Sequence, residues 1–250
     1  MDKKLVLDFQ VDVLQIISED IHGEISHEQI PFDTSRPFSI EEVKDRVRGK
    51  LSDAYLQHVT WFDANFTLIP MSLFSEQEIA TYYKLNFGKL ESNQSLLFEI
   101  IHELQLVVIY AVPTWILELC QSTLLQKTVH SQISFILHKQ FNDHSSDSTF
   151  LVLFEHCFVL SVKQNGKLQL CIPAEFQSET DVLYFILSNH QKMNLSNTNT
   201  LSCYVQGTHF DQEAFKNLWS QFKDFKDFSS NFYSQSAYQK TILCASSVVS

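Results

Sequence analysis

The alternation of hydrophobic and polar positions is clearest between residues 150 and 172, where it predicts strands. Apolar residues recur at every second position in two successive runs, which is typical of strands with one buried face. Asn165-Gly166 then predicts a type I′ hairpin turn into a third strand, because both residues tolerate positive φ. Ser178-x-x-Asp181 matches a capping box that opens a helix. This stretch therefore predicts three strands followed by a helix.

The N-terminal stretch shows the same order of patterns. Three apolar runs within residues 5–32 predict strands, and Ser39-x-x-Glu42 matches a capping box before a helix. The two stretches also share short sequence matches, which we interpret as an internal duplication. At an offset of 146 residues, Leu5–Leu7 aligns with Leu151–Leu153 and Val13-Leu14 with Val159-Leu160; after a four-residue difference in the turn, Ile30-Pro31 matches Ile172-Pro173.

The remaining patterns complete each half. Ser75-x-x-Glu78 is expected to cap a helix that ends at Phe87, with Gly88 at the C′ position. Asp211 is expected to cap another helix. The other predicted strands are 57–62, 65–70, 106–112 and 201–205, of which 106–112 is expected to be a central strand buried on both faces. Two further helices are predicted, one that starts at Pro113 and one at residues 131–141. Residues 92–104 have no clear pattern.

The polar string 142–149 is the predicted domain boundary. We therefore expect a first domain at residues 1–145 and a second at 146–229. The serine-rich residues 230–250 are expected to form an irregular tail, either docked or partly disordered.

Composition narrows the classes of function. The chain has 21 Phe but only 5 Gly in 250 residues, and glycine is what phosphate-cradling loops need. A net charge of −11 opposes binding to a nucleic-acid backbone. Five widely spaced cysteines without a CxxC motif predict core thiols rather than a disulfide framework. Because every apolar run is too short for a signal peptide or a membrane span, we expect a cytoplasmic protein.

The order of elements in each half resembles a ribonuclease H-like domain, and two such halves make the actin, Hsp70 and sugar-kinase architecture. Residues 107–113 (VVIYAVP), which lead into a helix, resemble the strand, Val-Pro, helix signature of Hsp70-like and type IV pilus actin-like proteins. Through residues 66–74, 108–113 and 150–207 the chain also resembles an uncharacterised bacterial family with an actin-like ATPase fold. The resemblance implies an α/β fold of two mixed-sheet domains around a cleft.

In actin-like families an Asp-x-Gly turn between the first two strands of each half binds phosphate and Mg²⁺, so the resemblance designates Asp8, Gln10, Glu155 and Gly207 as remnants of a nucleotide cleft. The first turn reads Asp8-Phe9-Gln10, with the acid but no glycine. In the second turn, at the offset of 146 residues, Phe154 aligns with Asp8. Glu155 follows it, again without glycine. A glycine pair is expected late in the second half, where only Gly207 stands.

Other candidate chemistry is weaker. The residues His130, His138, His144, Asp143 and Asp147 gather in one short stretch, but their spacing is not a tight ligand pattern, which favours solvated surface residues over a metal site. The P-loop, GxSxG and HExxH motifs are absent from the sequence.

The sequence therefore favours a non-catalytic actin-like scaffold that binds a protein partner. It needs no cofactor, does not bind nucleic acid and does not span a membrane. The alternative is a degenerate ATPase or kinase that still binds ATP with Mg²⁺ in the interdomain cleft.

Overall fold

The computed structural model describes residues 3–51, 55–123, 127–143, 145–193, 200–205, 210–221 and 230–233. The chain forms two compact units, one up to Phe135 and one from Ile136. Helix α4 (Gln132–Asn142) begins in the first unit and continues into the second. The predicted boundary at residue 145 lies in the loop after this helix, and the predicted division into domains 1–145 and 146–229 stays a prediction.

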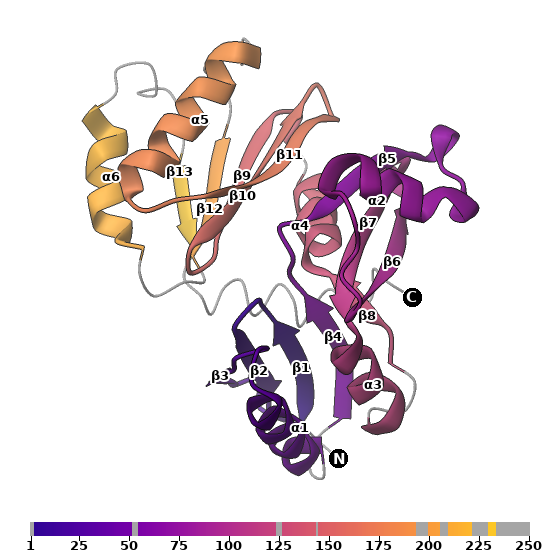
Figure 1. Cartoon of the computed structure of the whole chain (residues 1–250). Coiled ribbons are helices and arrows are strands. Elements are labelled where there is room, and N and C mark those ends of the chain that lie inside the picture. The colour runs from indigo at the N-terminus through magenta and orange to yellow at the C-terminus, as the bar shows by residue number, and fades with distance from the viewer. Residues whose placement is uncertain are drawn as a thin grey trace. The chain divides into compact units, whose positions relative to one another are not determined.

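The first unit is built on a five-stranded mixed sheet (Figure 1). Its first three strands form an antiparallel meander, and the other two run parallel to the first. The apolar face of α1 (Pro37–Leu51) is buried through Val43 and Val47, and α3 (Thr114–Thr123) precedes the last strand. In sheet order the strands are β3 (Ile25–Pro31), β2 (Val13–Glu19), β1 (Lys4–Phe9), β4 (Tyr55–Trp61) and β8 (Val129–Ser131).

A smaller antiparallel sheet is inserted between β4 and α3. Its central strand β7 (Leu106–Pro113) is buried almost throughout, as its continuous apolar run predicted. The flanking strands are β5 (Phe66–Pro70) and β6 (Gln94–Ile101), and the helical segments of the insertion are η1 (Met71–Leu73), η2 (Glu76–Glu78), α2 (Ile79–Phe87) and η3 (His102–Leu104).

The second unit has its own five-stranded mixed sheet with the same strand order as the first. Helices α5 (Glu179–Met193) and α6 (Gln212–Gln221) lie side by side on one face of the sheet (Figure 1) and bury Val182, Ile186 and Phe215 against it. In sheet order the strands are β11 (Lys167–Glu175), β10 (Cys157–Gln164), β9 (Ser148–Leu153), β12 (Thr200–Val205) and β13 (Ser230–Tyr233).

Strand pairing shows that the two halves correspond at an offset of 144 residues, not 146. In the first sheet Leu7 pairs with Ile16 and Val59, and in the second Leu151 pairs with Leu160 and Cys203. The predicted match of Ile30-Pro31 with Ile172-Pro173 is wrong in the same way, since Ala174 is the counterpart of Ile30. Side chains alternate with a period of two along a strand, so a two-residue error keeps the apolar pattern and leaves no trace in the sequence.

Three local predictions are confirmed. Asn165 and Gly166 have φ of 51° and 71°, as a type I′ turn requires. Asp181 Oδ2 accepts hydrogen bonds from the Ser178 N–H at 2.9 Å and its hydroxyl at 3.0 Å at the start of α5. Asp211 Oδ1 caps α6 by accepting from the next turn's backbone N–H groups.

Two predicted caps are wrong. The helix α1 begins at Pro37, and the hydroxyl of Ser39 accepts a hydrogen bond from the Asp33 N–H at 3.0 Å instead of capping that helix. Ser75 precedes the short helix η2 without a capping hydrogen bond from its side chain. Both serines match the spacing of a capping box, but neither side chain caps the predicted helix.

The predicted irregular tail begins with a strand. Residues 230–233 form β13, which pairs in parallel with β12. The short strand β8 was also missed, because three residues are too few to show a period. The remainder of the predicted tail, 234–250, lies outside the described residues.

Cys120, Cys171 and Cys203 are buried, as the sequence predicted for core thiols, whereas Cys157 is only half-buried. Burial raises the pKa of Cys120 and of Cys171 to about 12, so neither forms a reactive thiolate at neutral pH. Within the described parts of the chain, no helix is long and apolar enough to cross a membrane.

Replacing Gly166 with alanine is expected to destabilise the second unit by about 1 kcal/mol, because φ is +71° there and a Cβ is strained in that region. Urea unfolding should show this loss. Gly49→Ala, at a helical position with no positive φ, is the matched control and should stabilise the chain by about 0.5–1 kcal/mol. An unchanged free energy of unfolding in Gly166→Ala would contradict the assigned turn.

Candidate functional site

Asp8 lies in the central strand of the first sheet and is completely buried, with 0% of its surface exposed. Its strand β1 pairs with β2 on one side and β4 on the other, where Asp8 stands opposite Gln15 and Thr60. A carboxyl group in this position has no access to bulk water. Its ionisation therefore depends on the polar groups that surround it.

Two side chains from distant parts of the chain hold the carboxyl group. The Thr60 hydroxyl and the Gln132 amide both donate hydrogen bonds to Asp8 Oδ1. Thr60 comes from β4, and Gln132 is the first residue of α4; both are 0% exposed. The Asp8 carboxyl thus connects β1, β4 and the start of α4.

This environment keeps the Asp8 carboxyl neutral through the acidic range, up to about pH 7. Burial raises the pKa of Asp8 from an ordinary value of 3.8 to about 7, although the polar side chains of Thr60, Gln10 and Gln132 oppose the rise. The second oxygen, Oδ2, has no hydrogen-bond partner among the described residues. An unpartnered oxygen is far less costly on a neutral carboxyl than on a carboxylate.

The turn that follows Asp8 is tight and contains no glycine. The Gln10 N–H donates to the Val13 carbonyl at 2.9 Å, so only Val11 and Asp12 form the tip, and both are exposed. Gln10 itself is 5% exposed. Every residue of this turn carries a Cβ, so the turn lacks the glycine that usually lets backbone N–H groups approach a phosphate closely.

The turn of the second unit has the same geometry without the acid. The Phe154 N–H donates to the Cys157 carbonyl at 2.8 Å, and Glu155 lies at the tip. At the offset of 144 residues Phe154 corresponds to Gln10, and the counterpart of Asp8 is Val152, which is 1% exposed. The prediction that Phe154 replaces Asp8 is therefore wrong, because it rested on the offset of 146.

The structure brings Asp8 and Gln10 together and places Glu155 in the other unit; Gly207 lies outside the described residues. The role of these four residues in a nucleotide site stays a prediction. Sequence reasoning missed Thr60 and Gln132. The parallel pairing of β1 with β4 could have suggested Thr60, but nothing in the sequence links Gln132 to a residue 124 positions away.

Asp8 and its neighbours do not fit a hydrated Mg²⁺ and a phosphate group, which the actin-like fold implies. A carboxyl that orients hydrated Mg²⁺ must be ionised and reachable by water. Asp8 is buried, its Oδ1 is engaged by Thr60 and Gln132, and its pKa of about 7 favours the neutral form below that pH.

The described residues of the histidine-rich stretch have contacts other than with one another. Asp143 Oδ1 accepts from the Ser145 N–H at 3.3 Å, and Asp147 Oδ1 accepts from the Asn165 N–H at 2.7 Å. His130 Nδ1 lies 3.6 Å from Glu99 Oε1 instead. The described residues contain no group of three His, Cys, Asp or Glu side chains that could hold a metal ion, and His144 lies outside them.

Comparison with known proteins identifies the family. The model of a family described as "Protein of unknown function (DUF3822)" matches residues 55–223, which is more than half of the chain. The chain belongs to the DUF3822 family. No curated protein matches it significantly.

Solved structures show which fold this DUF3822 protein has. A Bacteroides thetaiotaomicron protein with an actin-like ATPase fold and unknown function is similar to it with a TM-score of 0.71 and 14% identity, covering 92% of this chain and 91% of that one. A chain of the PilM–PilN type IV pilus biogenesis complex is similar with a TM-score of 0.50 and 12% identity, covering 91% and 88%. The predicted actin-like, duplicated ribonuclease H-like fold is confirmed, and identities this low carry the fold alone.

Proposed function

We propose that this DUF3822 protein is a non-catalytic actin-like scaffold that acts by binding a protein partner. The observation that carries the proposal is the complete burial of Asp8, whose carboxyl is held by Thr60 and Gln132. In an actin-like ATPase the acid of this turn faces phosphate and Mg²⁺. In this chain the carboxyl at the same position connects strands β1 and β4 with helix α4.

The geometry of both hairpin turns supports the loss of nucleotide chemistry. Backbone N–H groups can approach a phosphate closely only where side chains leave room, which is the usual role of glycine. The turn after β1 contains Gln10, Val11 and Asp12, and the turn after β9 contains Glu155 and His156. Neither turn contains a glycine.

A role through a partner is consistent with the fold. The PilM–PilN structure is that of a complex, so an actin-like chain in that case assembles with another protein. That likeness says nothing about which partner this chain binds. The proposed role of this chain is therefore to bind another protein.

Isothermal titration of the full chain with Mg-ATP is expected to give no binding heat up to millimolar nucleotide, because the Asp8 carboxyl is buried and neither hairpin turn contains glycine. Malachite-green detection should find no phosphate release above the buffer rate. Affinity purification from native cells is expected to recover a stoichiometric protein partner.

Tight Mg-ATP binding that disappears in Asp8→Ala would overturn the proposal. It would favour the degenerate ATPase or kinase, with Asp8, Gln10, Glu155 and Gly207 as its nucleotide-binding residues. Asp12→Ala, an exposed acid in the same turn, is the matched control, because it removes a nearby carboxylate without touching the buried cluster.

A further inference from the structure

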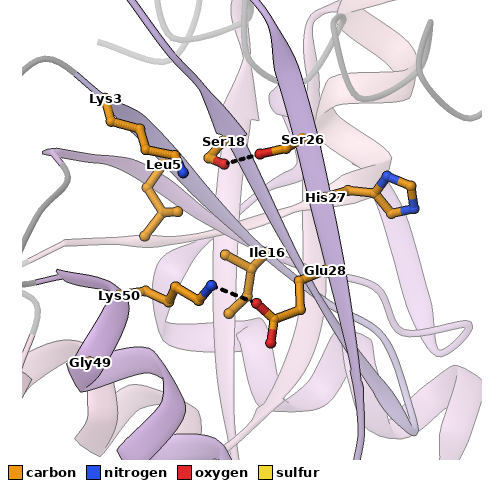
Figure 2. A pocket seen from close by; sticks show the side chains of 9 residues that line it. All are labelled: Lys3, Leu5, Ile16, Ser18, Ser26, His27, Glu28, Gly49 and Lys50. Carbon is orange, nitrogen blue, oxygen red and sulfur yellow. Dashed lines mark hydrogen bonds and ion pairs between the residues drawn. The ribbon is translucent and has the colours of Figure 1, made fainter.

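A hollow of about 300 Å³ lies in the first unit, away from the Asp8 cluster, between the end of α1 and the outer strands β2 and β3 (Figure 2). Its apolar part is formed by Leu5 and Ile16, which are 1% and 3% exposed. Beside them, the hydroxyls of Ser18 and Ser26 form a hydrogen bond of 2.8 Å. The hollow thus has a mainly polar lining over a small apolar floor.

The charged groups around the hollow are predominantly positive. Lys50 Nζ lies 2.6 Å from Glu28 Oε2, and Arg46, outside the hollow, lies 3.2 Å from Glu28 Oε1. One carboxylate is therefore shared by two cations. Lys3 adds a further cation, and its side chain extends toward Leu5 and Ser18 (Figure 2). The lining itself carries two lysines and one glutamate, a net charge of +1 on a chain whose net charge is −11, and Asp20 outside the lining interacts with the charge of Lys3.

Lys3 is the cation best placed to receive a ligand. Its ammonium makes no direct hydrogen bond with the residues that the structure describes and interacts through its charge with the Asp20 carboxylate, whereas Lys50 is engaged by Glu28. The ring of His27 points away from the other lining side chains, so its imidazole does not contribute (Figure 2). An ammonium beside hydroxyl groups and a small apolar floor matches a small ligand with an anionic head and a short apolar body.

We propose that this hollow is a binding site for a small organic anion. The carboxylate or phosphate group is received by Lys3 and by the hydroxyls of Ser18 and Ser26, and the apolar body packs on Leu5 and Ile16. A volume of about 300 Å³ is at the lower end of ligand pockets, so the site takes a molecule much smaller than a nucleotide.

Gly49 offers a direct way to close the hollow. It lies in the last turn of α1 and lines the hollow, and apart from its chain neighbours and the backbone of its own helix, no heavy atom lies within 4 Å of the place where a Cβ would stand. A large side chain there occupies open space without displacing the core. Because glycine is a poor helix former, the substitution also suits the helix.

The test is a ¹H–¹⁵N NMR titration of the full chain with three probes: benzoate, phenyl phosphate and the neutral benzyl alcohol. At constant ionic strength, either anion is expected to shift the amide signals of Leu5, Ser18 and Gly49, and the stronger of the two identifies the preferred head group. Benzyl alcohol is expected to bind at least about tenfold more weakly, because it lacks the charge that Lys3 receives.

Variants locate the site. Gly49→Phe should weaken anion binding at least about tenfold by filling the hollow, and Lys3→Gln about fivefold, whereas Gly49→Ala and the remote Lys84→Gln should stay within about twofold of the wild type. Circular dichroism checks that each variant folds. Absence of shifts with both anions at 20 mM, equal binding of benzyl alcohol, or unchanged binding in folded Gly49→Phe would each overturn the proposal.

Discussion

The wild-type chain is expected to lose about 4 kcal/mol of stability between pH 4 and pH 7.5 through Asp8 alone. Its pKa is raised from 3.8 to about 7 by burial, so between these values the folded chain keeps a proton that the unfolded chain has released. Stability therefore falls as pH rises, by about 1.4 kcal/mol per unit, and is level again above the folded pKa. The neutral form is the one that the buried cluster accommodates.

Asp8→Asn should abolish this dependence. An asparagine keeps an oxygen that accepts from Thr60 and Gln132 but never ionises, so the variant should be more stable than the wild type at pH 8, by up to about 4 kcal/mol. Urea titrations from pH 4 to pH 8 measure the free energy of unfolding at each pH. Both proteins carry Trp219→Phe in the second unit, so that the fluorescence comes from Trp61 and Trp115 of the first unit.

Asp12→Asn is the control for this experiment. Asp12 is an exposed acid at the tip of the same turn, and its substitution should leave the pH profile of the wild type unchanged. A slope in Asp8→Asn equal to that of the wild type would show that Asp8 is ionised in the folded chain. That outcome would also reopen the possibility of Mg²⁺ binding at this position.

Lys163→Met is expected to destabilise the second unit by about 3 kcal/mol. Lys163 is 4% exposed, and its ammonium donates to the carbonyls of Gln140 at 2.8 Å and Asp143 at 2.7 Å, at the C-terminal end of α4. The last carbonyls of a helix have no partners within the helix and carry partial negative charge. Methionine keeps the length of the side chain but leaves these buried acceptors unsatisfied, which costs about 1–3 kcal/mol for each group.

Hydrogen exchange followed by mass spectrometry can localise this effect. In Lys163→Met, peptides from α4 and β10 should lose protection, whereas peptides from β1 and β4 of the first unit should exchange as in the wild type. Lys167→Met replaces an exposed lysine in the neighbouring strand and should change protection little. Equal loss in both variants would mean that the carbonyl contacts of Lys163 contribute no stability.

The two units share a strand order but differ in the side chains at corresponding positions of their central strands. Asp8 and Thr60 stand opposite each other in the first sheet, and their counterparts in the second are the apolar Val152 and the aromatic Tyr204. Tyr204 stacks on Tyr233 with ring centroids 4.5 Å apart. The second unit thus has no carboxyl at the position of Asp8, so the buried polar cluster is a property of the first unit.

Much of the fold could be predicted from short stretches of sequence. The Asn165-Gly166 turn, the cap at Asp211 and the buried strand β7 each depend on a few neighbouring residues, so their signals are local. The strand β6 was not predicted, since its residues are half-buried on both faces and show no period of two.

The sequence by itself determined the α/β order, the duplication and the absence of glycine from both hairpin turns. Only the tertiary structure decided the offset between the halves, because strand periodicity cannot distinguish a shift of two residues. It also decided the state of Asp8. Burial and hydrogen bonds from residues 52 and 124 positions away set the charge of that carboxyl, and contacts of such range leave no local pattern in the chain.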